Sequence, residues 1–191
     1  MKAVLISIQP KWCEKIIGGE KTVEVQKTRP KLETPFKCYI YCTKGDKDKA
    51  LLVDGANSHI VHCTDCTRAI PVGGYVGNGT VVGEFVCSEI HEDRYYNKKT
   101  WELLDNACMD IKDMSDYLAG KETAYFWCIS GLKVYQKPRL LSDFRKSCNN
   151  GLYCESCAMY CEVQNYCGNA VLMLKRPPQN WCYVKENRYA N

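Results

Sequence analysis

Residues 3–19 constrain the fold most, because they combine a strand pattern with a short, capped helix. Residues 3–8 read AVLISI, an apolar run with the β-branched content of a buried strand. The segment PKWCEKIIGG follows, and its apolar residues Trp12, Ile16 and Ile17 have helical spacing. Proline begins this stretch and glycine ends it, which is typical of a short helix. The sequence therefore predicts a strand followed directly by a helix.

A second strand pattern follows the two glycines. Residues 22–26 read TVEVQ and alternate strictly between polar and apolar side chains. Because successive side chains of a strand point to opposite faces, Val23 and Val25 are expected to face a core. Thr22, Glu24 and Gln26 are expected together on the other face, where they are free to meet a ligand.

The rest of the chain adds short strands and few helices. Strand-like runs are FKCYIYCT, TVVGEFVCSEI, TAYFWCISGLKVY and AVLMLKRPP, the last of which we expect to be the final strand. Residues 98–119 are helical in parts, with an apolar face that contains Trp101, Leu104, Cys108 and Ile111. The prediction is a single α+β domain over residues 1–191, built as a small mixed β-barrel with flanking short helices. Residues 44–79 form a polar excursion from it, expected to be a hairpin of its own.

Composition and charge limit the classes of partner. The run AVLISI is too short to cross a bilayer and does not resemble a secretory signal. We therefore expect a cytoplasmic monomer without a membrane partner. The net charge of +4 permits a polyanionic partner without requiring one. Six cations lie in the first thirty-one residues: Lys11, Lys15, Lys21, Lys27, Arg29 and Lys31. They form either a functional basic surface or a solvated one.

The fourteen cysteines favour metal ligation over disulfides, because no secretory signal accompanies them. Cys154 and Cys157 have the C-x2-C spacing that grips a tetrahedral ion, and Cys148 and Cys167 can complete a four-thiolate site. We expect a structural zinc in this cysteine-rich insertion at residues 148–168. A set in which Cys161 replaces Cys148, an iron–sulfur cluster, and unmetallated or disulfide-paired cysteines are the alternatives. Other cysteines sit in apolar strings and are expected to be small buried side chains: Cys38, Cys42, Cys87, Cys108, Cys128 and Cys182.

A second cysteine-containing segment, HIVHCTDC, lies inside the polar excursion. It places His59, His62, Cys63 and Cys66 within eight residues. Such cramped spacing favours a plain hairpin over a metal site. A contribution of this group to a site shared with the later cysteines stays open.

Motifs for nucleophilic catalysis or nucleotide hydrolysis are missing from the sequence. It contains no G-x-S-x-G, P-loop or dinucleotide fingerprint. The carboxylates best placed for proton transfer are Glu24 and Glu84. Because Glu84 interrupts an apolar strand, we expect it either at a strand edge or in a cavity wall beside a cation. Trp12 beside Lys11 suits the stacking of an unpaired base, whereas Trp127 is expected in the core.

The segment LISIQPKWCEKIIGGEKTVEVQK resembles the start of an ASCH domain, of the bacterial or phage type, in the PUA-like superfamily. The family pattern is an apolar strand, a short helix and a G-x-K-x-x-E-x-R strand, which Gly19, Lys21 and Glu24 match. The resemblance continues through VVGEFVCSEI, AYFWCISGLKVYQKP and RPPQNWCYV. It implies a PUA-like β-barrel with a cleft beside the first helix and second strand, which binds RNA or a modified nucleoside. Gln26 stands where the family usually has arginine.

Some small ASCH proteins are amidohydrolases that deacylate N4-acetylcytidine with a lysine, a threonine and a glutamate. The resemblance carries the lysine over to Lys21. The position of the threonine is Glu24 here, and a carboxylate cannot replace a hydroxyl nucleophile.

The function predicted from the sequence is an RNA- or nucleotide-binding module. In this hypothesis Lys21, Lys27 and Arg29 meet phosphate, Glu24 and Gln26 read a base edge, and Lys11 and Trp12 complete the binding surface. The alternative is a hydrolase of modified nucleosides or RNA, in which Lys21 and Glu24 handle the proton. A third hypothesis is an interaction protein whose cysteine-rich segment docks a protein partner.

Overall fold

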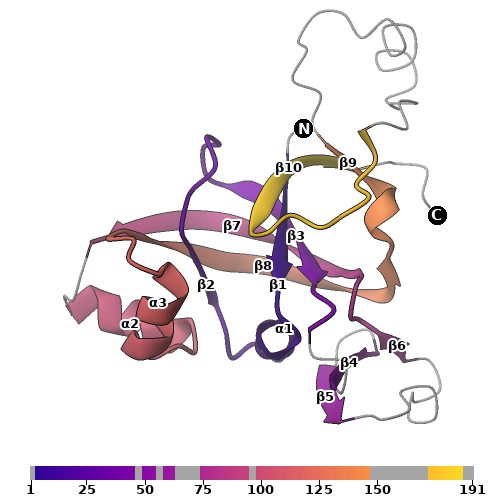
Figure 1. Cartoon of the computed structure of the whole chain (residues 1–191), viewed down its shortest axis with the longest axis horizontal. Coiled ribbons are helices and arrows are strands. Elements are labelled where there is room, and N and C mark those ends of the chain that lie inside the picture. Colours follow the sequence, from indigo (N-terminus) through magenta and orange to yellow (C-terminus); the bar gives the residue numbers. More distant parts are fainter. Residues whose placement is uncertain are drawn as a thin grey trace, which may run out of the picture.

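The structure, a computed structural model, describes residues 3–45, 49–54, 58–62, 74–94, 98–146 and 172–186. Figure 1 shows the arrangement of the helices and strands. Within these ranges the main sheet has seven strands, in the order β2 (Val23–Gln26), β8 (Ala124–Arg139), β7 (Val81–Asp93), β3 (Phe36–Cys42), β1 (Ala3–Ile8), β10 (Trp181–Glu186) and β9 (Phe144–Lys146). A smaller sheet holds β5 (Ser58–His62), β4 (Lys49–Val53) and β6 (Tyr75–Val76). The helices are α1 (Pro10–Ile17), α2 (Lys98–Asn106) and α3 (Ile111–Leu118), with a short 3-10 turn at Leu141–Asp143.

The prediction of a closed β-barrel was wrong, although the mixed α+β class is confirmed. Strand β1 runs parallel to β3, and the other pairings in the main sheet are antiparallel. The terminal strands β2 and β9 do not pair with each other in the described part of the chain. Closure requires a continuous ladder with consistent stagger, and these two strands have only four and three residues. The result is an open sheet.

Aromatic packing holds this open sheet in a curled shape. Trp127 of β8 is fully buried, and its ring lies 5.6 Å from that of Phe36 and 6.0 Å from that of Trp181. Trp127 and Trp181 belong to strands separated by three others in the sheet order. Their contact therefore shows that the sheet folds back on itself around a shared core. The prediction that Trp127 lies in the core is confirmed.

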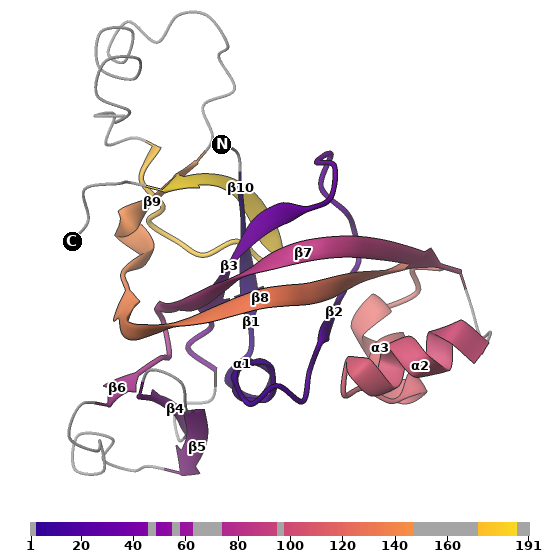
Figure 2. The same ribbon diagram turned by 180° about the vertical axis from the view of Figure 1, so that it is seen from behind.

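The predicted unit of strand, helix and strand is confirmed as β1, α1 and β2. Pro10 begins α1, and the helix ends at Ile17. Gly18 N–H donates to the Glu14 carbonyl at 2.8 Å, and Gly19 has a φ of 79°, which favours glycine. This turn reverses the chain into β2. Figure 2 shows α1 near one end of β1, with β2 leading away toward α2 and α3.

The described part of the polar excursion contains the expected hairpin. Strands β4 and β5 pair antiparallel from Lys49 opposite His62 to Val53 opposite Ser58. This small sheet packs against α1 through β4 and β5. The side chains of His59 and His62, together with Cys63 and Cys66, lie outside the described residues, so the alternative in which they contribute to a metal site stays untested.

Two local predictions were wrong. Trp101 was expected with Leu104 on the apolar face of the helical parts of residues 98–119, but it is 53% exposed, while Leu104 is buried. The helical region splits into α2 and α3 around Cys108, whose φ is 52°. The last described strand is also β10 rather than the described part of AVLMLKRPP, residues 172–178, where Met173 forms an isolated bridge to Arg145. Pro177 and Pro178 lie between Met173 and β10. Because proline has no N–H to donate, strand pairing does not continue from Met173 into β10.

The cysteines of the described residues are free thiols, and most pack as small apolar side chains. Cys13, Cys38, Cys42 and Cys87 are buried, whereas Cys108, Cys128 and Cys182 are only partly covered. Burial raises the pKa of Cys87 to about 12, so this thiol stays protonated at neutral pH. The helices of the described part of the chain lack the length and apolarity of a membrane span.

Candidate functional site

A cavity of about 260 Å³ lies where β1, α1, β2 and α3 meet the segment before β10. The parallel strands β1 and β3 both end at it, with Ile8 opposite Cys42. Ser7 of β1 holds the segment before β10 in place, because its hydroxyl donates to the Pro178 carbonyl at 2.7 Å. The full lining is Ser7, Ile8, Gln9, Trp12, Lys21, Glu24, Val25, Gln26, Thr43, Met109, Tyr117, Gln179 and Asn180.

Lys21 forms the buried cationic part of this cavity. Its side chain is 1% exposed, and Nζ donates to the Ala107 carbonyl at 2.8 Å. Ala107 directly follows the last residue of α2, so the ammonium lies at the end of the helix dipole where a cation is favourable. The backbone N–H of Thr22 donates to the neighbouring Asn106 carbonyl at 2.9 Å. The start of β2 thus caps the carboxyl end of α2.

Glu24 and Gln26 stand next to Lys21 on the polar face of β2, as the alternation predicted. Glu24 Oε2 lies 3.3 Å from Lys21 Nζ. The other carboxylate oxygen, Oε1, accepts a hydrogen bond from Gln26 Nε2 at 3.0 Å. Val23 and Val25 pack in the core with the residues of α2 and α3. All four residues of β2 are buried, so the polar face of this strand lines a cavity rather than open surface.

Two acceptor atoms of this group make no hydrogen bond among the described residues, although one of them, Glu24 Oε2, is ion-paired with Lys21 Nζ at 3.3 Å. They are Glu24 Oε2 and Gln26 Oε1. Glu24 is 8% exposed and Gln26 is 2% exposed. A buried acceptor without a donor costs about 1–3 kcal/mol. The pair therefore favours a ligand that brings N–H or O–H groups into the cavity.

Two aromatic side chains form cavity walls, and each carries a cation on its ring. Trp12 has Lys11 Nζ at 4.3 Å and Lys21 Nζ at 5.2 Å from its ring centroid. Tyr117 has Lys27 Nζ at 4.8 Å. Burial and the nearby Glu24 carboxylate raise the pKa of Tyr117, so its phenol keeps its proton at neutral pH. Lys11 and Lys27 do not line the cavity themselves but contact the two rings that do, and we call these two cations its rim.

The structure brings together four of the seven predicted binding residues: Trp12, Lys21, Glu24 and Gln26. Lys11 and Lys27 do not line the cavity, but each contacts an aromatic ring that does. Arg29 is exposed and does not line the cavity. The predicted metal ligands Cys148, Cys154, Cys157 and Cys167, and the alternative Cys161, lie outside the described residues. Among the residues that are described, no group of three or more His, Cys, Asp or Glu side chains could hold a metal ion.

Nine lining residues were not predicted as site residues. Gln9 and Thr43 follow the ends of β1 and β3, and Thr43 N–H donates to the Ile8 carbonyl at 2.8 Å. Recognising β1 and β3 as a parallel pair would have indicated them, because the carboxyl ends of parallel strands meet at one edge. Met109 and Tyr117 carry no local signal, since only the packing of α2 and α3 against β2 brings them to the cavity.

Glu84 lies away from this site. Its strand, β7, runs between β3 and β8, so the strand-edge interpretation was wrong. The carboxylate accepts hydrogen bonds from Lys37 at 2.9 Å and from Tyr135 at 2.6 Å. Burial favours the neutral acid, but these hydrogen bonds outweigh it and hold the pKa of Glu84 below its usual value. Glu84 is therefore a structural anion beside a cation.

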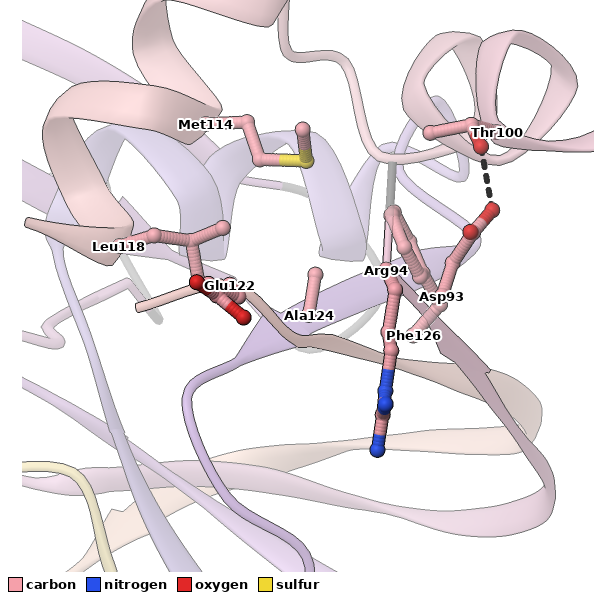
Figure 3. Close-up of a pocket in the computed structure, with 8 residues that line it drawn as sticks. All are labelled: Asp93, Arg94, Thr100, Met114, Leu118, Glu122, Ala124 and Phe126. Carbon is pink, nitrogen blue, oxygen red and sulfur yellow. Dashed lines mark hydrogen bonds between the residues drawn. The ribbon is translucent and has the colours of Figure 1, made fainter. Parts of the chain in front are cut away.

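A second cavity lies between α2, α3 and the paired ends of β7 and β8 (Figure 3). Its walls include Met114, Leu118 and Phe126, and the Thr100 hydroxyl donates to Asp93 at its edge. Its volume is about 10 Å³, close to the minimum for one water molecule. It is too small for an organic ligand, so the larger cavity is the candidate site.

Comparisons with known proteins support the fold through solved structures. No protein-family model and no curated protein matches the sequence. The crystal structure of ASCH from Zymomonas mobilis matches with a TM-score of 0.53 and 16% identity, over 96% of this chain and 87% of that one. A tyrosine-to-phenylalanine variant of that protein matches with a TM-score of 0.53 and 17% identity, over 97% of this chain and 91% of that one. A serine-to-alanine variant also matches, with a TM-score of 0.53 and 16% identity, over 96% and 88%. The chain described here has the fold of an ASCH domain.

Proposed function

We propose that this chain is a cytoplasmic module that binds single-stranded RNA by taking one base into the cavity beside α1 and β2. The observation that carries the proposal is the pair of buried acceptors, Gln26 Oε1 and Glu24 Oε2: neither makes a hydrogen bond among the described residues, and Glu24 Oε2 has an ion pair with Lys21. Nucleobases supply N–H donors in a flat ring that fits between aromatic walls.

The size of the cavity supports a single base rather than a longer ligand. Its volume of about 260 Å³ is below the range of roughly 300–1,000 Å³ that drug-sized ligands occupy. Trp12 and Tyr117 supply aromatic walls, and base stacking on such a side chain contributes about 1–3 kcal/mol. The rest of the RNA would lie outside, over the rim.

The rim provides cations for the phosphates. Lys11 is exposed and Lys27 is half-buried, and both lie on the rings that wall the cavity. Lys21 has a different part from the phosphate contact expected from the sequence, because its ammonium is buried on the Ala107 carbonyl and the Glu24 carboxylate. We assign Lys21 to fixing Glu24 inside the cavity, and Lys11 and Lys27 to the backbone of the RNA.

The amidohydrolase alternative uses the same residues. Lys21 and Glu24 share the cavity, which both hypotheses require. No further observation favours bond cleavage. Turnover of acylated nucleosides by the purified chain would support that alternative in place of simple binding.

The proposal predicts a salt-dependent affinity to which Lys27 contributes. Each phosphate contact with single-stranded nucleic acid adds about 0.7 to the slope of log K against log salt concentration. We expect Lys27→Gln to weaken binding of a fluorescent single-stranded RNA and to reduce this slope by about 0.7. Fluorescence anisotropy at several salt concentrations measures both quantities.

Lys112→Gln is the matched control, because Lys112 is an exposed cation on α3 that pairs with Asp116 and does not line the cavity. It makes the same change of net charge. If both variants shifted the slope equally, the contribution of Lys27 would be general charge and not a contact. If the wild-type chain bound no RNA at any salt concentration, the proposed function would be rejected.

We further propose that Cys148, Cys154, Cys157 and Cys167 hold one structural zinc ion. The support is the spacing of these thiols in a segment with few aliphatic side chains, where metal binding supplies folding free energy. Elemental analysis of the purified chain should find about one zinc per chain, and Cys154→Ser/Cys157→Ser should lose it. Cys128→Ser, a change at a partly covered thiol of β8, should retain it. A wild-type chain purified without zinc would contradict the proposal.

A further inference from the structure

We propose that the cavity selects guanine among the bases. This inference rests on the proposed function and adds the identity of the base. It is carried by the order of hydrogen-bonding atoms along the side chains of Gln26, Glu24 and Lys21, which contact one another in that sequence.

The orientation of the Gln26 amide is fixed by its neighbour. Nε2 donates to Glu24 Oε1 at 3.0 Å, and the reversed amide would place two oxygens against each other. Oε1 is therefore the atom that Gln26 offers to a ligand. Gln26 lines the cavity, and its Oε1 is a buried acceptor that makes no hydrogen bond among the described residues.

Glu24 and Lys21 continue this row. Glu24 Oε2 is a second acceptor, 3.3 Å from Lys21 Nζ. An ammonium has three donors, and Lys21 uses one on the Ala107 carbonyl while another faces Glu24. The third is left for a ligand oxygen. The groups left for a ligand are thus two acceptors, Gln26 Oε1 and Glu24 Oε2, and one donor, Lys21 Nζ. The hydrogen bond between Gln26 and Glu24 lies between the two acceptors.

The Watson–Crick edge of guanine is complementary to this row. It presents the 2-amino group and N1–H as two adjacent donors, followed by O6 as an acceptor. Adenine and cytosine carry a ring nitrogen acceptor beside their amino group. This nitrogen would face Gln26 Oε1 or Glu24 Oε2, and two acceptors repel each other. Uracil has one N–H between two carbonyl oxygens. Only guanine among the four bases supplies a donor to both buried acceptors and an acceptor to Lys21.

The pairing also explains why Gln26 and Glu24 are both needed. A carboxylate alone could accept both guanine donors, but here Glu24 Oε1 already accepts from Gln26. The 2-amino group would then meet Gln26 Oε1, and N1–H would meet Glu24 Oε2. Loss of the 2-amino group should therefore leave one buried acceptor unpaired, which is costly in a site built around that contact.

Isothermal titration of the full chain with five mononucleotides tests the inference. The probes are the 5′-monophosphates of guanosine, inosine, adenosine, cytidine and uridine. Inosine differs from guanosine only by the missing 2-amino group, so we expect at least about tenfold weaker binding of inosine monophosphate, or about 1.4 kcal/mol. The other three should bind more weakly still.

A variant pair locates the contact. Gln26→Leu should bring the affinity ratio of guanosine to inosine monophosphate close to one, whereas Thr22→Val should preserve it. Thr22 is exposed next to β2 and does not line the cavity, so it is the matched control. The comparison on the wild-type chain requires no variant, and it holds even if Gln26→Leu folds poorly.

The outcomes separate this inference from the proposed function. Equal affinity for guanosine and inosine monophosphate, or tightest binding of cytidine monophosphate, would overturn guanine selection and leave RNA binding standing. No binding of any mononucleotide, together with no binding of single-stranded RNA, would overturn the proposed function itself.

Discussion

Lys21→Met is expected to lower the free energy of unfolding by about 3–5 kcal/mol and to abolish RNA binding. The substitution leaves the Glu24 carboxylate, only 8% exposed, without its cation. It also removes the donor to the Ala107 carbonyl at the end of α2. Urea unfolding followed by circular dichroism measures the first effect, and anisotropy with fluorescent RNA measures the second.

A double variant separates stability from binding at this site. Replacing a buried ion pair by apolar side chains of similar volume is often neutral or stabilising. Lys21→Met/Glu24→Leu should therefore recover the part of the lost stability that comes from the unpaired carboxylate, and it should still fail to bind RNA, because the acceptor in the cavity is gone. A double variant that bound RNA as tightly as the wild-type chain would remove Glu24 from the proposed site.

Lys15→Met is the control for both variants. Lys15 pairs with Glu20 at 2.9 Å, but its side chain is 38% exposed and that of Glu20 is 63% exposed. Such surface pairs contribute little to stability, so this variant should unfold and bind like the wild-type chain. If Lys21→Met were as mild as Lys15→Met, the Lys21–Glu24 pair would not be buried as described.

Trp127→Ala is expected to destabilise the fold by about 3–5 kcal/mol, because it opens a large cavity in the core. Trp127 is fully buried and joins β8 to Phe36 of β3 and to Trp181 of β10. It is therefore a main contact that keeps the open sheet curled. Chemical unfolding monitored by far-ultraviolet circular dichroism measures the loss.

Trp101→Ala provides the matched comparison, since Trp101 of α2 is 53% exposed. A surface substitution of this kind usually changes the free energy of unfolding by less than about 0.5 kcal/mol. Comparable losses for the two tryptophans would contradict the assignment of Trp127 to the core and of Trp101 to the surface.

The sequence was sufficient to predict the unit of β1, α1 and β2. Helical spacing, a first proline and a final pair of glycines are local signals, and α1 ends where they indicate. The alternation of residues 22–26 also separated Val23 and Val25 from Glu24 and Gln26, because strand geometry leaves no other arrangement. The residues that carry the proposed contacts could thus be chosen before the structure was known.

The features that the sequence did not predict depend on pairings between distant segments. The open sheet follows from short strands at both edges and from β10, which pairs with the first strand of the chain. Lys21 was expected at a phosphate, yet its hydrogen-bond acceptor is Ala107, 86 residues away. Tyr117 enters the cavity from α3 in the same way. No local periodicity encodes such contacts.

A crystal structure of the chain with a short guanine-containing single-stranded RNA tests the central claim most directly. We expect one base inside the cavity between Trp12 and Tyr117, with its N–H groups donating to Glu24 Oε2 and Gln26 Oε1 and the phosphates near Lys11 or Lys27. RNA bound on another face, with no base in the cavity, would contradict the account.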